Sequence, residues 1–170
     1  MEMDKKTWKK ILFLDIDGVL NSLNFLTQTG GRKGFIEREK IALLNQLKPY
    51  DVEVVISSSW GYNEDTVNTL KSCGLELSII GGIEHFHSDW ICRGNEIAKW
   101  IIDKFDNYSL FTGKPYLYEN YKGDDYEYVI LDDDEDILMC QKDNFVHTNR
   151  DSGLTENDIE KIINILERKK

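Results

Sequence analysis

The sequence predicts an α/β fold: a parallel β-sheet that is doubly wound by helices covering both of its faces. Short apolar runs typical of buried strands alternate with longer segments that carry an apolar stripe at helical spacing. Three of the apolar runs also end directly in polar clusters, and parallel strands bring their carboxyl ends to one edge of a sheet, where ligands bind. The 170 residues are expected to form a single domain over 1–170, with its core over 11–166.

The apolar runs predict five strands, over residues 11–14, 52–56, 77–80, 128–131 and 144–148. The first is the clearest, because Ile-Leu-Phe-Leu is continuously apolar and stops at Asp15, as expected of a strand buried on both faces. The second run ends in consecutive serines, and the third is closed by Gly81 and Gly82. The fourth leads into an acidic run over 132–136.

Amphipathic spacing predicts helices from about residue 37 to Pro49, over 64–73, from about residue 94, and after Thr155. The last is the clearest, because Thr155 is a favourable N-cap with Asp158 three residues later, and apolar residues follow at helical spacing. Residues 22–35 contain several glycines and are expected to form a loop. Residues 106–125 are rich in tyrosine and are expected to form an irregular insertion or flap.

Composition and charge limit the possible classes of function. The net charge is −10, so long-range attraction to nucleic acid is not expected, although a local basic patch is compatible with this total. The apolar run from Ile11 is too short and too charged for a signal peptide or a membrane span, and no membrane partner is expected. Cys73, Cys92 and Cys140 are widely spaced, which favours free thiols and a cytoplasmic location.

Asp15 and Asp17 follow the first strand and are expected to lie beside the acidic run over 132–136. Their mutual repulsion would be relieved by a divalent cation, and hard oxygen ligands of this kind suit Mg²⁺. One carboxylate could then attack a phosphoryl group while the other acts as acid and base. Gly18 allows a tight backbone there, so that its amide could approach a phosphate.

The segment Ile-Leu-Phe-Leu-Asp-Ile-Asp-Gly-Val-Leu, residues 11–20, resembles the first motif of the haloacid-dehalogenase (HAD) superfamily. The resemblance implies a HAD-like, Rossmann-like fold. It also implies that Asp15 is the nucleophile, forming an aspartyl-phosphate, and that Asp17 protonates the leaving group and then activates water. An acid at the second position is the phosphatase version of the motif, since the ATPases of the superfamily usually carry threonine there and its dehalogenases lack this acid.

The resemblance assigns three further motifs. Ser57, with Ser58 as the alternative, would bind the phosphoryl oxygens. Arg93 would offset the charge of the phosphoryl group. The metal ligands would be Asp15, Asp17, Asp132 and Asp133. Asp133 would bind Mg²⁺ directly, and Asp132 or Asp136 could hold a metal-bound water.

Four short segments also resemble the phosphatase-type domain of the "Swiss Army knife" RNA-repair proteins: Ser-Ser-Ser-Trp at 57–60, Arg-Gly-x-Glu-Ile at 93–97, Leu-Asp-Asp-Asp at 131–134 and Gly-Leu-Thr at 153–155. The short connections between motifs leave no room for a large cap domain. A nucleotide or a phosphorylated nucleic-acid end is therefore the expected substrate. The alternatives are a small-molecule or phosphoprotein phosphatase and, in a different class, a non-enzymatic phospho-accepting signalling module. No protein partner is predicted.

Several other residues have two interpretations. Trp60 could pack in the core or form a platform for base stacking. Arg32 and Lys33 could belong to a solvated loop, or they could join Arg93 and Arg150 in a basic rim that contacts the substrate. The pair His85 and His87 suggests zinc, but no nearby cysteine or histidine completes such a site.

Overall fold

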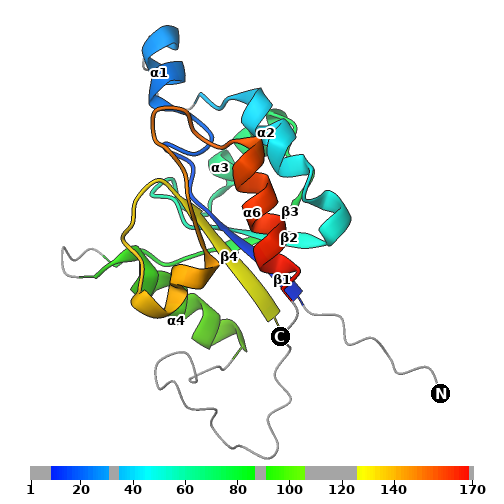
Figure 1. The fold of residues 1–170 in the computed structure, drawn as a ribbon. Helices are drawn as coiled ribbons and strands as arrows, with labels where there is room; N and C mark the ends of the chain where they lie inside the picture. Colours follow the sequence, from blue (N-terminus) through cyan, green and yellow to red (C-terminus); the bar gives the residue numbers. More distant parts are fainter. Residues whose placement is uncertain (1–8, 31–34, 87–90, 106–125, 169–170) are drawn as a thin grey trace, which may run out of the picture.

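The computed structural model of the protein describes residues 9–30, 35–86, 91–105 and 126–168 (Figure 1). At its centre lies a five-stranded sheet in the order β3-β2-β1-β4-β5, and all neighbouring strands are parallel. The strands are β1 (Lys9–Leu14), β2 (Val52–Ile56), β3 (Ser78–Gly82), β4 (Tyr126–Asp132) and β5 (Phe145–His147). The chain proceeds from β1 outward to β3 and then returns to the other side of β1, so the strand order reverses between β1 and β4. A crevice for a ligand is expected outside the carboxyl ends of these two strands.

The helices are α1 (Leu23–Thr29), α2 (Arg38–Asn45), α3 (Glu64–Ser72), α4 (Arg93–Phe105) and α6 (Glu156–Leu166), with short 3₁₀ helices η1 (Lys48–Tyr50) and η2 (Met139–Asn144). Helix α6 begins as the sequence predicts, because the Thr155 hydroxyl accepts from the Asp158 amide and the Asp158 carboxylate accepts from the Thr155 amide. None of the helices in the described ranges is long and apolar enough to cross a membrane.

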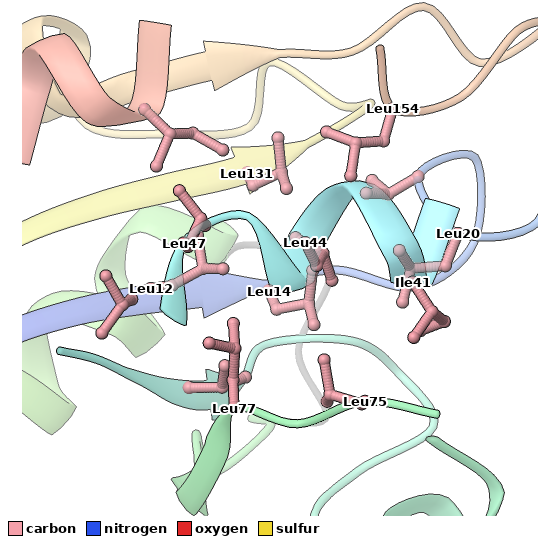
Figure 2. Packing of buried hydrophobic residues seen from close by; sticks show 14 of the residues in the cluster. Leu12, Leu14, Leu20, Ile41, Leu44, Leu47, Leu75, Leu77, Leu131 and Leu154 are labelled. Carbon is pink, nitrogen blue, oxygen red and sulfur yellow. The ribbon is translucent and has the colours of Figure 1, made fainter. Parts of the chain in front are cut away.

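Two cores pack against the two faces of the sheet, as the doubly wound prediction requires. Alternate residues of a strand point to opposite faces, so Leu12 and Leu14 of β1 pack with residues of α2, α3 and α6, whereas Ile11 and Phe13 pack with residues of α4. Figure 2 shows Leu44 and its neighbours from the α2 region lying over the β1 leucines. The strands are apolar on both sides because each side is buried.

Three elements differ from the sequence prediction. Helix α1 lies where residues 22–35 were expected to form only a loop: Ser22 caps its first turn, and Gly30 ends it in a left-handed conformation. Strand β3 is shifted toward its carboxyl end and includes both glycines, since Gly81 and Gly82 pair with β2. Helix α2 ends at Asn45, and Pro49 lies instead in η1.

The remaining predicted elements are confirmed, with boundaries that differ by a few residues. Among the described residues no separate domain covers the carboxyl edge of the sheet, in agreement with the expected absence of a large cap. Residues 106–125, for which an insertion or flap was predicted, lie outside the described ranges, as do Arg32, Lys33 and His87.

Candidate active site

Three carboxylates meet at the point where the strand order reverses. Asp15 follows β1 directly, Asp132 ends β4, and Asp133 follows it. Each of the three offers a carboxylate oxygen within 4.8 Å of the other two. The register brings them together: Leu14 is paired with Leu131, and the Asp15 amide donates to the Leu131 carbonyl at 3.0 Å. Asp15 and Asp132 are buried, so their charges have little help from solvent.

Burial and mutual repulsion make this cluster costly to ionise. Burial, followed by the negative charge of Asp132, raises the pKa of Asp15 to about 8, although the charge of Arg93 opposes the shift. Burial raises the pKa of Asp132 to about 6, against a hydrogen bond from the Asp134 amide and the charge of Arg93. Burial also raises the pKa of Asp133. A bound divalent cation would remove this penalty, and three carboxylate oxygens match the ligand preference of Mg²⁺.

Gly18 makes the approach of Asp133 possible. Its φ is +73°, a left-handed conformation that favours glycine, and a Cβ atom built there would lie only 2.2 Å from Asp133 Oδ2. Its amide donates to Asn21 Oδ1 at 3.0 Å. In the structure the role of this glycine is thus close packing against the β4 acidic run, in addition to the tight turn that the sequence predicts.

Asp17 is turned away from the three-carboxylate cluster. Its Oδ1 accepts from Asn21 Nδ2 at 2.7 Å, and its Oδ2 accepts from the indole nitrogen of Trp60 at 3.0 Å. The Asp17 side chain is exposed, in contrast to Asp15. The structure therefore does not group the Asp17 carboxylate with the other three candidate metal ligands.

The turn after β2 contributes two serines with different environments. Both are fully buried, and the Ser57 amide extends the ladder to β1 by donating to the Leu14 carbonyl at 2.9 Å. The Ser57 hydroxyl has no hydrogen-bond partner among the described residues, whereas the Ser58 hydroxyl accepts from the Trp60 amide at 3.4 Å. A buried hydroxyl without a partner is unfavourable, so Ser57 is the one of the two whose oxygen is available to a ligand.

Arg93 begins α4, on the other side of the site. Its positive charge opposes the rise in the pKa values of both Asp15 and Asp132. Arg93 Nη1 is buried and has no hydrogen-bond partner within the described ranges. Together with the Ser57 hydroxyl, it gives the site two unsatisfied donors.

The other candidates take different places. Asp136 caps α4, since its Oδ2 accepts from the Arg93 amide at 3.0 Å. Arg150 lies beside the cluster, with its Nε 3.5 Å from Asp133 Oδ2. Trp60 packs partly against the core while its indole N–H reaches Asp17, so it combines packing with a polar contact at the site. The ring nitrogens of His85 face Glu96 and a backbone carbonyl, so among the described residues His85 is not grouped with another histidine.

Sequence reasoning did not identify Asn21, Glu96 or Gln141 as supporting residues. Asn21 is buried and holds both Asp17 and the Gly18 amide. Gln141 is also buried, and it joins the loop after β4 to α4 by donating from Nε2 to the Gly94 carbonyl. The sequence shows Asn21 only as a polar residue next to an apolar stretch, in Val-Leu-Asn at 19–21, and this pattern does not reveal its hydrogen-bond partners.

These features agree with the comparison with protein families. The model of the HAD domain in Swiss Army Knife RNA repair proteins matches residues 11–159, so the chain belongs to this family of HAD domains. The match covers all the strands, the acidic cluster and Arg93. Membership supports a phosphatase-type hydrolase in general. The comparison with curated proteins finds no match, and the comparison with solved structures finds none.

Proposed function

We propose that the protein is a Mg²⁺-dependent phosphomonoesterase that acts through an aspartyl-phosphate on Asp15. The observation that carries this proposal is a cluster of carboxylates together with two buried donors that lack hydrogen-bond partners. Three carboxylates lie within 4.8 Å of one another, and two buried donors, the Ser57 hydroxyl and Arg93 Nη1, have no partner among the described residues. A bound cation would neutralise the three carboxylates, and the oxygens of a phosphoryl group would accept hydrogen bonds from the two donors.

The donor set fits the expected metal. Asp15, Asp132 and Asp133 would hold Mg²⁺ through carboxylate oxygens, whereas Asp17, whose carboxylate accepts from Asn21 and Trp60, lies outside this group of three. Bound Mg²⁺ would supply positive charge that holds the phosphoryl group and the buried carboxylates together.

The chain's own residues then perform a two-step hydrolysis. Asp15 attacks the phosphorus atom, the bond to the ester oxygen breaks, and Asp17 gives its proton to that oxygen as the alcohol leaves. Asp17, now ionised, takes a proton from water, which attacks the phosphorus of the aspartyl-phosphate. Inorganic phosphate departs, and both carboxyl groups return to their starting states. The Ser57 hydroxyl and Arg93 bind the non-reacting phosphoryl oxygens throughout.

The proposed substrate is a nucleotide or a phosphorylated nucleic-acid end. Its support is the family, whose description names RNA repair, together with an edge that no separate domain covers in the described part of the chain. Arg150 and Arg93 supply positive charge beside the cluster within a chain of net charge −10. We also propose a cytoplasmic location, since Cys73, Cys92 and Cys140 are all unpaired.

Substrate preference is tested by measuring kcat/KM with Mg²⁺ for a mononucleotide, for short 3′- and 5′-phosphorylated oligonucleotides and for a sugar phosphate, at low and high salt. We expect the nucleotide or an oligonucleotide to be preferred over the sugar phosphate by at least about fivefold, because stacking of one base contributes about 1–3 kcal/mol. Use of the oligonucleotide should fall as salt rises. EDTA should abolish all of these activities.

Equal or better use of the sugar phosphate, without salt dependence for the oligonucleotides, would remove nucleic acid from the proposal and leave a small-molecule phosphatase. Activity that survives EDTA would contradict the metal site. Release of a single equivalent of the leaving alcohol, with the phosphoryl group retained on the protein and no turnover, would instead indicate a phospho-accepting signalling module.

A further inference from the structure

The first turn of α4 carries a buried carboxylate that the proposed chemistry does not use. The Glu96 side chain is 7% exposed. Its Oε1 accepts from the Phe86 amide at 2.8 Å, and its Oε2 lies 3.1 Å from His85 Nδ1 and 3.7 Å from Arg93 Nε. Burying a carboxylate is costly unless such partners compensate it, so Glu96 is unlike an ordinary surface acid on a helix.

Glu96 contacts only one side of the Arg93 guanidinium. The two residues are three positions apart on a helix, a spacing that puts their side chains next to each other. The contact is at Nε, and Nη1 remains buried without a partner in the described part of the protein. A guanidinium is a rigid planar group, so an anchor at Nε determines where its other nitrogens point.

The backbone of Arg93 is already fixed by other contacts. Asp136 accepts from the Arg93 amide at 3.0 Å through Oδ2 and from the Gly94 amide at 3.0 Å through its backbone carbonyl, and Gln141 donates to the Gly94 carbonyl at 2.9 Å. A Cβ atom at Gly94 would lie 2.4 Å from the Leu138 nitrogen, so the helix start and the loop after β4 are in close contact. These contacts position the main chain of Arg93 but not its guanidinium. Among the described residues, Glu96 is the carboxylate that lies within ion-pair distance of the guanidinium.

The same carboxylate also reaches the turn that carries Ser57. His85 Nε2 lies 2.9 Å from the Ser58 carbonyl oxygen, while Nδ1 faces Glu96. Both neighbours of the ring are acceptors, so the ring bridges Glu96 and the turn after β2. Glu96 is therefore linked directly to Arg93, which carries one unsatisfied donor of the site. Through His85 it is also linked to the turn that carries the other, the Ser57 hydroxyl.

We propose that Glu96 is a positioning residue for phosphate binding, a role that rests on the proposed function. It anchors Arg93 so that Nη1 faces the phosphoryl site, and through His85 it fixes the turn after β2. Glu96 itself does not touch the substrate. Because Glu96 contacts Arg93 directly and the turn only through His85, its effect on phosphate binding should pass chiefly through Arg93.

The test is a double-mutant cycle on the full chain with Mg²⁺, with inorganic phosphate as the probe and calorimetry as the measurement. Glu96→Gln retains the shape and an oxygen for the Phe86 amide but removes the charge. We expect it to weaken phosphate binding about tenfold, the size of a lost charge-assisted contact. In an Arg93→Met background the same change should alter binding by less than about twofold, because the group on which Glu96 acts is gone.

Two further variants separate positioning from loss of charge and from general destabilisation. Glu84→Gln is the matched control: this exposed acid, which lies 3.4 Å from Lys99 Nζ, should leave phosphate binding unchanged when neutralised. Glu96→Asp keeps the charge but is one methylene shorter, and it should give an intermediate loss. If Glu96→Gln unfolds, Glu96→Asp takes its place in the cycle.

The possible results are distinguishable. If wild-type protein binds no phosphate, the proposed function fails and the positioning role fails with it. If wild type binds phosphate and Arg93→Met weakens binding, the proposed site stands. An equal loss from the Glu96 substitution in both backgrounds would then overturn the positioning role alone, as would an equal loss in Glu84→Gln.

Discussion

Replacing Asp15 by asparagine should lower turnover by more than about 10³-fold, as expected when an essential nucleophile is removed. The amide cannot form the phosphoenzyme, and the Asp17 carboxylate is engaged with Asn21 and Trp60. The loss of turnover is measured as steady-state phosphate release with Mg²⁺ and an aryl phosphate as substrate. Asp15→Ala should behave in the same way, and it cannot regain a carboxylate by deamidation.

Asp134→Asn is the matched control for this prediction. Asp134 lies in the same acidic stretch but is exposed; its backbone amide, which the substitution keeps, donates to Asp132 Oδ1, and its charge adds a minor rise to the pKa values of Asp132 and Asp133. We expect its activity to stay within about threefold of wild type, as is usual for a surface substitution. If Asp15→Asn retained a substantial fraction of activity, or if Asp134→Asn lost as much as Asp15→Asn, the nucleophile would have to be reassigned.

In the absence of Mg²⁺, the protein should lose stability as pH rises from about 4 to about 8. The pKa of Asp15 is 3.8 in its ordinary state and about 8 in the folded protein, so over this range the folded state binds a proton that the unfolded state has released. The stability contributed by such a group is fully present below the lower pKa and is lost as pH rises through the higher one. The free energy of unfolding should fall by about 1.4 kcal/mol per pH unit for each carboxyl that is protonated in the folded state and ionised in the unfolded state.

Asp132, with a folded pKa of about 6, should add to this slope at the acidic end of the range. Denaturant unfolding at several pH values, with EDTA and then with Mg²⁺, measures the effect. Mg²⁺ should stabilise the protein more at pH 8 than at pH 5, because the ion binds ionised carboxylates. Asp15→Asn removes the titrating group, so without Mg²⁺ it should flatten the slope and be more stable than wild type at pH 8. An unchanged slope in Asp15→Asn would contradict the assigned cause.

The sequence was most informative where burial is continuous. The central strands β1, β2 and β4 could be predicted because each contains an apolar run buried on both faces, and the alignment of the strands followed from the rule that parallel strands end at one edge. The same rule brought Asp15, Asp132 and Asp133 together before any geometry was known. Helix α1 was missed because it buries no residue, so it leaves no amphipathic stripe, and its ends depend on local capping by Ser22 and Gly30.

The supporting contacts could not be predicted in this way. Glu96 meets His85 only because α4 and the loop after β3 are packed together, and Asn21 reaches Asp17 only because of a tight turn at Gly18. The sequence shows these residues as ordinary polar side chains. Their roles depend on contacts in the folded protein, which the hydrophobic pattern of the sequence does not reveal.

The central claim is that Asp15 carries the phosphoryl group, and reductive trapping tests it most directly. Borohydride converts an aspartyl-phosphate to homoserine, and peptide mass spectrometry then locates the modified residue. The Asp17→Asn variant with Mg²⁺ and an aryl phosphate is the suitable sample: an aryl leaving group needs little help from an acid, whereas hydrolysis of the intermediate needs the base that this variant lacks. The account predicts homoserine at position 15 and at no other position. Homoserine at another aspartate, or release of the aryl alcohol at a full burst with position 15 unmodified, would contradict it.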